Sequence, residues 1–108
     1  GVVPEARVAA LLAAVRGETS GGFAAVQAQC RALVADGYAA KRVLSQCGAA
    51  LLAPDTVTRD ELAVARCVVL LADAEYALLG GADEYLQLLD ALSGAHQLLT
   101  ATPANSSS

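Results

Sequence analysis

The chain has 108 residues, a net charge of −4 and a composition that is 56% hydrophobic. This length fits one domain with a single core, and the richness in Ala and Leu favours helix over strand. The acidic balance argues against much direct nucleic-acid binding, because phosphate binding needs clustered basic residues. Arg31, Lys41 and Arg42 are better explained as a solvated helix face. The apolar run from Cys67 to Ala72 is far too short to span a membrane.

Side chains that could support catalysis or metal binding are few. His96 is the only histidine, and no potential partner lies three or four positions away. Asp83 and Glu84 are adjacent, and neighbouring helical positions point apart. The three cysteines are odd in number and do not have zinc-site spacing, so we expect buried free thiols in a reducing compartment, the cytosol or nucleus: Cys30, Cys47 and Cys67. The sequence therefore predicts a non-enzymatic domain without a cofactor or metal of its own.

Apolar residues recur at helical spacing in five segments, which predicts an all-α bundle of about five helices. The first helix is expected from about Pro4 to Arg16, because proline suits a first helical position. The second is expected from about Phe23 to Asp36, with Gly37 as its left-handed stop. The third runs from about Ala40 to Ala53, where Pro54 bars continuation.

The fourth helix is expected from Thr58 to about Leu79. Thr58 and Glu61 have the spacing of a capping box, in which each side chain accepts from the backbone amide of the other residue. Two apolar stripes follow. The first is Leu62, Ala65, Val69, Ala72 and Tyr76, and the second is Val64, Cys67, Val68, Leu71 and Leu78. A helix that is apolar on two sides is buried on two sides. Either it crosses the centre of the domain, or one side contacts another subunit.

The fifth helix is expected to begin near Ala82, after Gly80 and Gly81, with Asp83 and Glu84 in its first turn. Its apolar residues continue at helical spacing to Leu99. Residues 102–108 are polar and lack periodicity, which predicts a disordered tail after a helical domain over residues 1–101. Met is absent throughout, which indicates a piece of a longer polypeptide.

One segment is more distinctive than a generic helix. The run Gly81-Ala82-Asp83-Glu84-Tyr85-Leu86-Gln87-Leu88-Leu89 resembles a signature near the C-terminus of replication factor C small subunits, the subunits of the eukaryotic sliding-clamp loader. Leu33 to Tyr38, followed by Leu44-Ser45-Gln46, resembles the segment between the second and third collar helices of that family. The opening Gly1-Val2-Val3-Pro4 resembles the start of the same domain. The subunit-4-like type is the nearest in pattern.

This resemblance implies a C-terminal collar domain. Replication factor C is a heteropentamer of AAA+ ATPases that loads the PCNA sliding clamp onto primer-template DNA in the nucleus, during DNA replication and repair. ATP and magnesium would belong to upstream AAA+ domains absent from this chain. The collar domain would contribute oligomerisation with the other replication factor C subunits and no hydrolysis.

Both lines of reasoning predict more apolar surface on the last two helices than a solitary bundle can hide. We expect the subunit interface to draw on a set of apolar residues from these helices: Val64, Val68, Leu71, Leu78, Leu86 and Leu89. The alternative function is a free-standing helical adaptor that binds a partner helix in an apolar groove.

Overall fold

The computed structural model describes residues 1–53 and 60–101, and these residues form five helices with no strand. The helices are α1 (Glu5–Val15), α2 (Phe23–Ala35), α3 (Ala40–Leu51), α4 (Glu61–Leu79) and α5 (Glu84–Thr100). The predicted all-α bundle is confirmed, and most helix ends lie within two residues of expectation. The tail over residues 102–108 lies outside the described residues.

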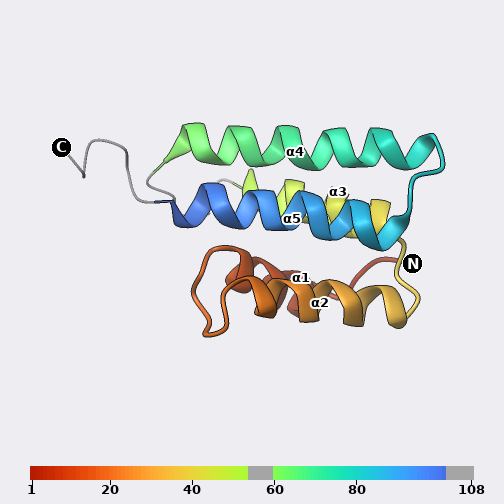
Figure 1. Ribbon diagram of the computed structural model, residues 1–108, viewed down its shortest axis with the longest axis horizontal. Helices are drawn as coiled ribbons and strands as arrows, with labels where there is room; N and C mark the ends of the chain where they lie inside the picture. Colours follow the sequence, from red (N-terminus) through yellow and green to blue (C-terminus); the bar gives the residue numbers. More distant parts are fainter. Residues whose placement is uncertain (54–59, 102–108) are drawn as a thin grey trace.

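Helix α5 lies at the centre of the bundle. It runs antiparallel to α4, and it also packs against α1, α2 and α3 (Figure 1). Helix α4 packs mainly on α3 and α5 and forms one outer edge of the molecule, far from α1 and α2. One interpretation of the sequence placed the fourth helix at the centre of the domain, but in the structure the fifth helix occupies that position.

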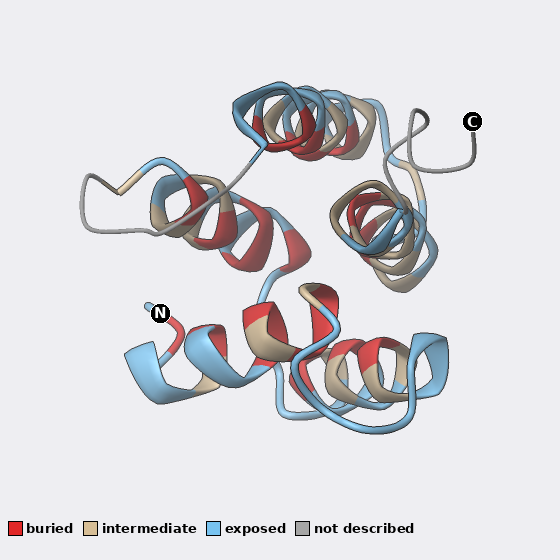
Figure 2. Cartoon of the chain, turned by 90° about the vertical axis from the view of Figure 1, so that its left-hand side faces the viewer, coloured by how far each residue is buried: buried red, intermediate tan, exposed pale blue. Residues whose placement is uncertain are grey.

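The core is apolar throughout the described residues, with no buried polar or charged side chain. Buried residues of all five helices turn toward the middle of the bundle, and exposed residues turn outward (Figure 2). The largest fully buried side chains come from every helix: Leu11, Leu33, Leu44, Leu71, Leu88 and Leu92. One core shared by all five helices makes the bundle a single packing unit.

Two helix ends show why glycine stands where it does. Gly37 and Gly81 both have φ of +90°, a conformation that side chains rarely adopt. After α2, the Gly37 amide donates to the Val34 carbonyl and the Tyr38 amide donates to the Leu33 carbonyl. The same paired bonds follow α4 around Gly81. This is the Schellman arrangement, which satisfies the last carbonyls of a helix and turns the chain sharply.

The start of α4 differs from the sequence prediction. Asp60 is the N-cap residue, and its Oδ1 accepts from the Ala63 amide at 3.0 Å. Glu61 is the first helical residue rather than the third, so it does not occupy the capping-box position. Thr58 lies outside the described residues. The prediction was wrong by two residues because Asp at position 60 caps a helix as well as Thr does.

The acidic pair at the start of α5 has two separate tasks. Asp83 is the N-cap of its own helix and accepts from the Leu86 amide at 2.8 Å. Glu84 instead reaches α3, where its Oε1 accepts from the Ala40 amide at 2.9 Å. The N-cap residue of α3 is Ala39, whose side chain has no acceptor. A residue 44 positions away therefore supplies the missing cap.

Two further hydrogen bonds tie segments that are distant in sequence. The Gln46 side chain accepts from the Val3 amide at 2.8 Å and donates to the Val3 carbonyl at 2.9 Å, which fixes the N-terminal segment on α3. His96 Nδ1 lies 2.9 Å from the Val15 carbonyl at the end of α1. Since a carbonyl only accepts, Nδ1 carries the proton in this contact. His96 is thus accounted for as a helix-end contact.

Candidate subunit interface

Helix α4 presents two apolar faces, and the structure separates them. The inner face packs on α3 and α5 and contains Ala63, Val64, Cys67, Leu71 and Ala74. Leu71 is 1% exposed and Val64 is 8% exposed. Both are core residues, so their assignment to a subunit interface is corrected. The periodicity of apolar residues indicates two stripes on this helix, but it does not indicate which stripe the neighbouring helices cover.

The other predicted interface residues divide as follows. Val68, Leu78 and Leu89 are half-buried and pack against the core. Leu86, near the start of α5, is 60% exposed and is free to meet a partner. Of the predicted interface residues, Leu86 is therefore an exposed surface residue, and the three half-buried residues lie at the edge of the core.

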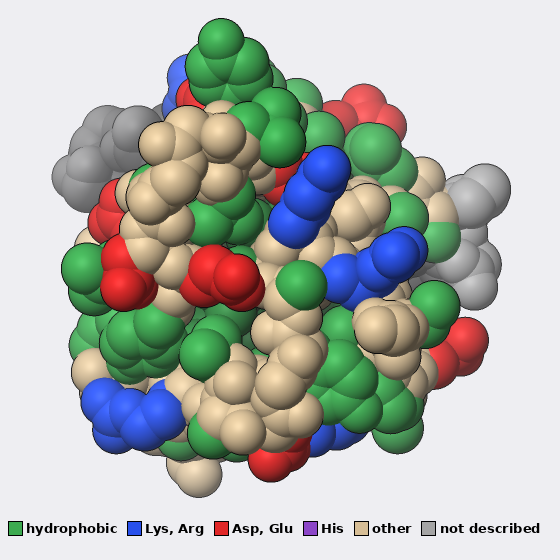
Figure 3. Space-filling model, turned by 90° about the vertical axis from the view of Figure 1, so that its right-hand side faces the viewer, with side chains coloured by type: hydrophobic (Ala, Val, Ile, Leu, Met, Phe, Trp, Pro, Cys, Tyr) green, Lys and Arg blue, Asp and Glu red, His purple; other side chains and the backbone are tan. Residues whose placement is uncertain are grey.

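The outward face of α4 carries an extended apolar surface. Its six residues are all exposed, and we call them the α4 outer stripe: Leu62, Ala65, Val69, Ala72, Tyr76 and Leu79. The Tyr76 side chain is 79% exposed and the Leu79 side chain 70%. Figure 3 views the end of the bundle where α4 turns into α5 and shows hydrophobic side chains at the top, over α4. Exposed apolar surface of this kind marks interaction sites in soluble proteins.

The stripe has a regular spacing along the helix. Its residues follow one another at alternating steps of three and four, which is the heptad repeat of helices that pack along one another. From Leu62 to Leu79 the stripe is about 26 Å long at 1.5 Å per residue. The sequence predicts the first five residues as one stripe, but the part of the predicted interface that lies on α4 belongs to the other stripe. The signal that sequence reasoning overlooked is the unbroken heptad spacing.

A hollow lies beside the stripe, between α4 and α5. It has a volume of about 410 Å³ and is lined by Ala65, Arg66, Val69, Leu70 and Leu98. Gly94 of α5 makes room for this arrangement, because a Cβ there would lie 3.0 Å from Leu70 Cδ1. Leu70 can therefore lie over α5. The hollow has the apolar lining that suits a bulky hydrophobic side chain from a partner.

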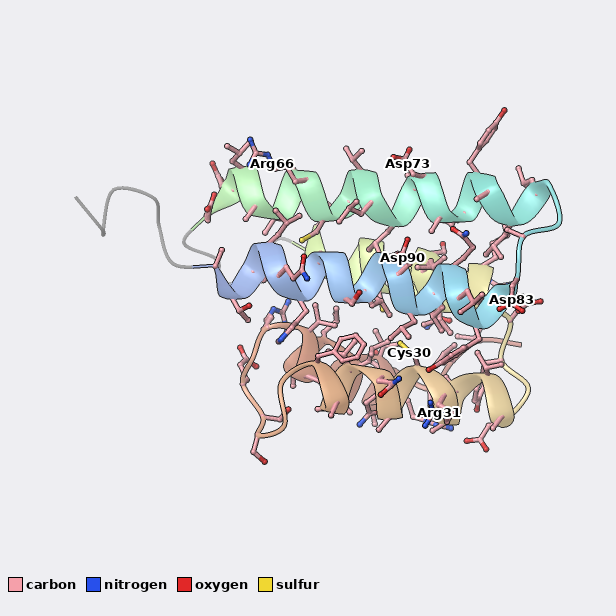
Figure 4. All side chains as sticks on the ribbon, in the orientation of Figure 1. Cys30, Arg31, Arg66, Asp73, Asp83 and Asp90 are labelled. Atoms are coloured by element: carbon pink, nitrogen blue, oxygen red, sulfur yellow. The ribbon has the colours of Figure 1, made fainter. Side chains whose placement is uncertain are left out.

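Two charged residues border the stripe on one side. Arg66 and Asp73 are exposed and point away from the bundle on the outer side of α4 (Figure 4). Each directly follows an alanine of the stripe, so both lie along the same edge. Across residues 1–53 and 60–101, neither has an ion-pair partner within the chain. Charges at such flanking positions select partner and orientation in paired helices.

Groups that could support chemistry are used structurally. Burial raises the pKa of the Cys30 thiol to about 12, and burial together with the nearby Cys30 raises the pKa of Cys47 to about 12. Burial also raises the pKa of Cys67. Thiols of this kind are poor nucleophiles. In the described part of the chain, no three acidic, histidine or cysteine side chains are grouped so that they could hold a metal ion. Among the described helices, none combines the length and the apolar character needed to cross a bilayer.

Comparison with known proteins identifies the domain. A family model described as the replication factor C C-terminal domain matches residues 3–94. The chain belongs to this family. The matched range runs from the buried Val3 to Gly94, beside the α4–α5 hollow, and so includes the whole α4 outer stripe.

A curated relative agrees with this assignment. Replication factor C subunit 2 of rice, Oryza sativa subsp. japonica, is 36% identical to this chain over 93 residues, which cover 86% of the chain. The same residues cover 26% of the rice protein, so the chain spans about a quarter of the length of this relative.

The replication factor C signature has a physical role in this fold. Gly81 supplies the left-handed turn after α4, Asp83 caps α5, and Glu84 caps α3. Leu88 is fully buried, and Leu86 is exposed. The segment therefore joins α3, α4 and α5 at one end of the bundle. That role fixes the position of α4, and with it the direction in which the outer stripe faces.

Proposed function

We propose that this chain is the collar domain of a replication factor C small subunit, and that it acts by holding subunits of the clamp loader together. The single observation that carries this proposal is the α4 outer stripe, which leaves six apolar residues of one helix exposed. Membership of the replication factor C C-terminal domain family supports it. The naming of the rice relative as a replication factor C subunit supplies the class of partner.

The parent protein would act in the nucleus. Its AAA+ domains, supplied with ATP and magnesium, would open the PCNA clamp and place it on primer-template DNA during replication and repair. The collar would do none of this chemistry and would keep the ATPase domains in register. The subunit-4-like type is the one that the sequence pattern resembles most, and the proposal extends to it on that resemblance alone.

The energetics suit a shared interface. Complete burial of a Val, Leu or aromatic side chain contributes about 1.5–3 kcal/mol, and the four large residues of the stripe, which are each more than half exposed, have more than half of that still to gain. Association costs at least about 4 kcal/mol in lost rigid-body freedom, so a contact along one helix gives a moderate affinity. A ring of subunits overcomes this limit, because each subunit is held from two sides.

A matched pair of substitutions tests the proposal. Ala72→Glu places a charge in the middle of the stripe, and Ala32→Glu makes the same change at an exposed position of α2. Both replace an exposed helical alanine, so each should change the stability of the isolated chain by no more than about 0.5 kcal/mol. In the full-length subunit co-expressed with the other replication factor C subunits, the Ala72→Glu protein should fail to co-purify with its partners, and the Ala32→Glu protein should assemble. Equal assembly of the two variants would contradict the proposal.

The same experiment addresses the alternative function. A free-standing adaptor could use the hollow between α4 and α5 to hold a partner helix. Such an adaptor would bind without the other replication factor C subunits, and neither substitution would alter a clamp-loader complex. Loss of co-purification that is specific to Ala72→Glu favours the collar function.

A further inference from the structure

We propose that the α4 outer stripe also pairs with itself, by antiparallel packing against α4 of a second copy of this chain. This goes beyond the proposed function, because it requires no other subunit. The argument rests on the sizes and charges of the stripe residues, which are complementary to the same residues in reverse order.

Side-chain size gives the first match. Reversing one helix inverts the order of its residues, so the first heptad position of one copy faces the fourth position of the other. Leu62 then faces Leu79, Ala65 faces Tyr76, and Val69 faces Ala72 of the second copy. Each alanine thus meets a larger side chain, which keeps the helices evenly spaced and leaves few voids. A parallel pair would place alanine on alanine and tyrosine on tyrosine, so its spacing would be uneven.

The hollow gives the second match. Ala65 lines the hollow between α4 and α5, together with Val69, Leu70 and Leu98. In the antiparallel pair, the highly exposed Tyr76 of the second copy stands opposite Ala65. Its ring would pack over this open apolar hollow, and by symmetry the reverse contact forms as well. The antiparallel arrangement therefore buries the most exposed large residue, Tyr76, against the apolar hollow of the other copy.

Charge gives the third match. Arg66 and Asp73 border the stripe on the same edge and lack an ion-pair partner within the described chain. Antiparallel pairing brings Arg66 of each copy beside Asp73 of the other, which makes two identical ion pairs. In a parallel pair, Arg66 would instead lie near Glu61 of the second copy, and Asp73 would lie near Val68. The charges therefore fit both a second copy and one orientation of it.

The symmetry of the contact fixes the assembly. Each copy uses the same surface, so the contact is isologous and closes at two subunits. In a clamp loader, another subunit would compete for the same stripe. Two free chains would then cover each other's α4 outer stripe until another subunit of the clamp loader displaces one of them.

Sedimentation equilibrium of the 108-residue chain tests the pairing. The chain should show a concentration-dependent approach to twice its 10.9 kDa mass. Arg66→Asp alone and Asp73→Arg alone should each raise the dissociation constant about tenfold, because each creates two like-charge contacts. The double variant Arg66→Asp/Asp73→Arg should return to within about threefold of the original value, while circular dichroism shows equal helix content in all four proteins.

Each result is decisive. A chain that remains a monomer at all concentrations would overturn the pairing. A dimer that Arg66→Asp weakens and that the added Asp73→Arg does not restore would overturn the antiparallel orientation, because in a parallel pair the Arg66→Asp change places an acid beside Glu61 whatever residue stands at position 73. Neither failure bears on assembly with replication factor C subunits, which the Ala72→Glu and Ala32→Glu comparison measures separately.

Discussion

Replacing Glu84 by alanine removes the only cap that the structure shows at the start of α3. The Ala40 amide would lose a charge-assisted hydrogen bond of 2.9 Å, and Ala40 is fully buried, so water reaches that amide poorly. Loss of an N-cap costs about 1 kcal/mol, and a buried donor without a partner costs about 1–3 kcal/mol. We therefore expect the free energy of unfolding to fall by about 2 kcal/mol. At about 2.1 cal/mol/K per residue, this corresponds to a Tm about 9 °C lower.

Thermal unfolding followed by circular dichroism measures this effect, with Asp90→Ala as the control. Asp90 is an exposed acid on the same helix, and its side chain makes no described hydrogen bond. Adding Ala39→Asp to Glu84→Ala should recover about 1 kcal/mol, because a local cap then replaces the distant one. If Glu84→Ala were no less stable than Asp90→Ala, or if the added Asp gave no recovery, the distant-cap explanation would be refuted.

Further predictions concern the helix ends, the core and the thiols. Gly37→Ala should lower the free energy of unfolding by about 1 kcal/mol, because Gly37 has a φ of +90°. Gly48→Ala, inside α3, should raise the free energy of unfolding by about 0.5–1 kcal/mol, because the added Cβ would meet only Leu71 Cδ1, at 3.9 Å. Urea denaturation measures both changes. Leu71→Ala should lower the free energy of unfolding by about 2–5 kcal/mol in the same assay, and a loss below about 1 kcal/mol would contradict its core position. Burial raises the pKa of the Cys30 and Cys47 thiols from 9.0 to about 12. Below pH 9 these thiols are neutral in both the folded and the unfolded chain, so they should not affect stability. As the pH rises from 9 toward 12 they ionise first in the unfolded chain, so the free energy of unfolding should fall. That decline should shrink in a Cys30→Val/Cys47→Val variant measured under reducing conditions.

The helices themselves could be predicted because their signals are local. Apolar residues at helical spacing indicated each segment, and Gly37 and Pro54 marked where two of them end. The end at Gly37 is confirmed in the structure, where the Schellman bonds need only residues within one turn. Such information is contained in short stretches of sequence.

The candidate site could be predicted only in part, because its definition depends on distant residues. The sequence indicated two apolar stripes on α4, but the predicted interface included Val64 and Leu71, which α3 and α5 cover. It explained Glu84 as a helix-starting acid, whereas the carboxylate caps a different helix. Periodicity describes one helix at a time, so it cannot report which face a neighbour covers.

The distant hydrogen bonds at helix ends have a consequence for amide hydrogen exchange. In most helices the first amides exchange quickly by local fraying. The Ala40 amide is bonded to the Glu84 side chain, so its exchange requires this contact between the start of α5 and α3 to break. The Val3 amide, held by Gln46, likewise exchanges only when the N-terminal segment leaves α3. Two amides at nominally frayed positions should therefore exchange slowly, on the timescale of concerted opening, so that both ends of the bundle they tie are as protected as the helix interiors.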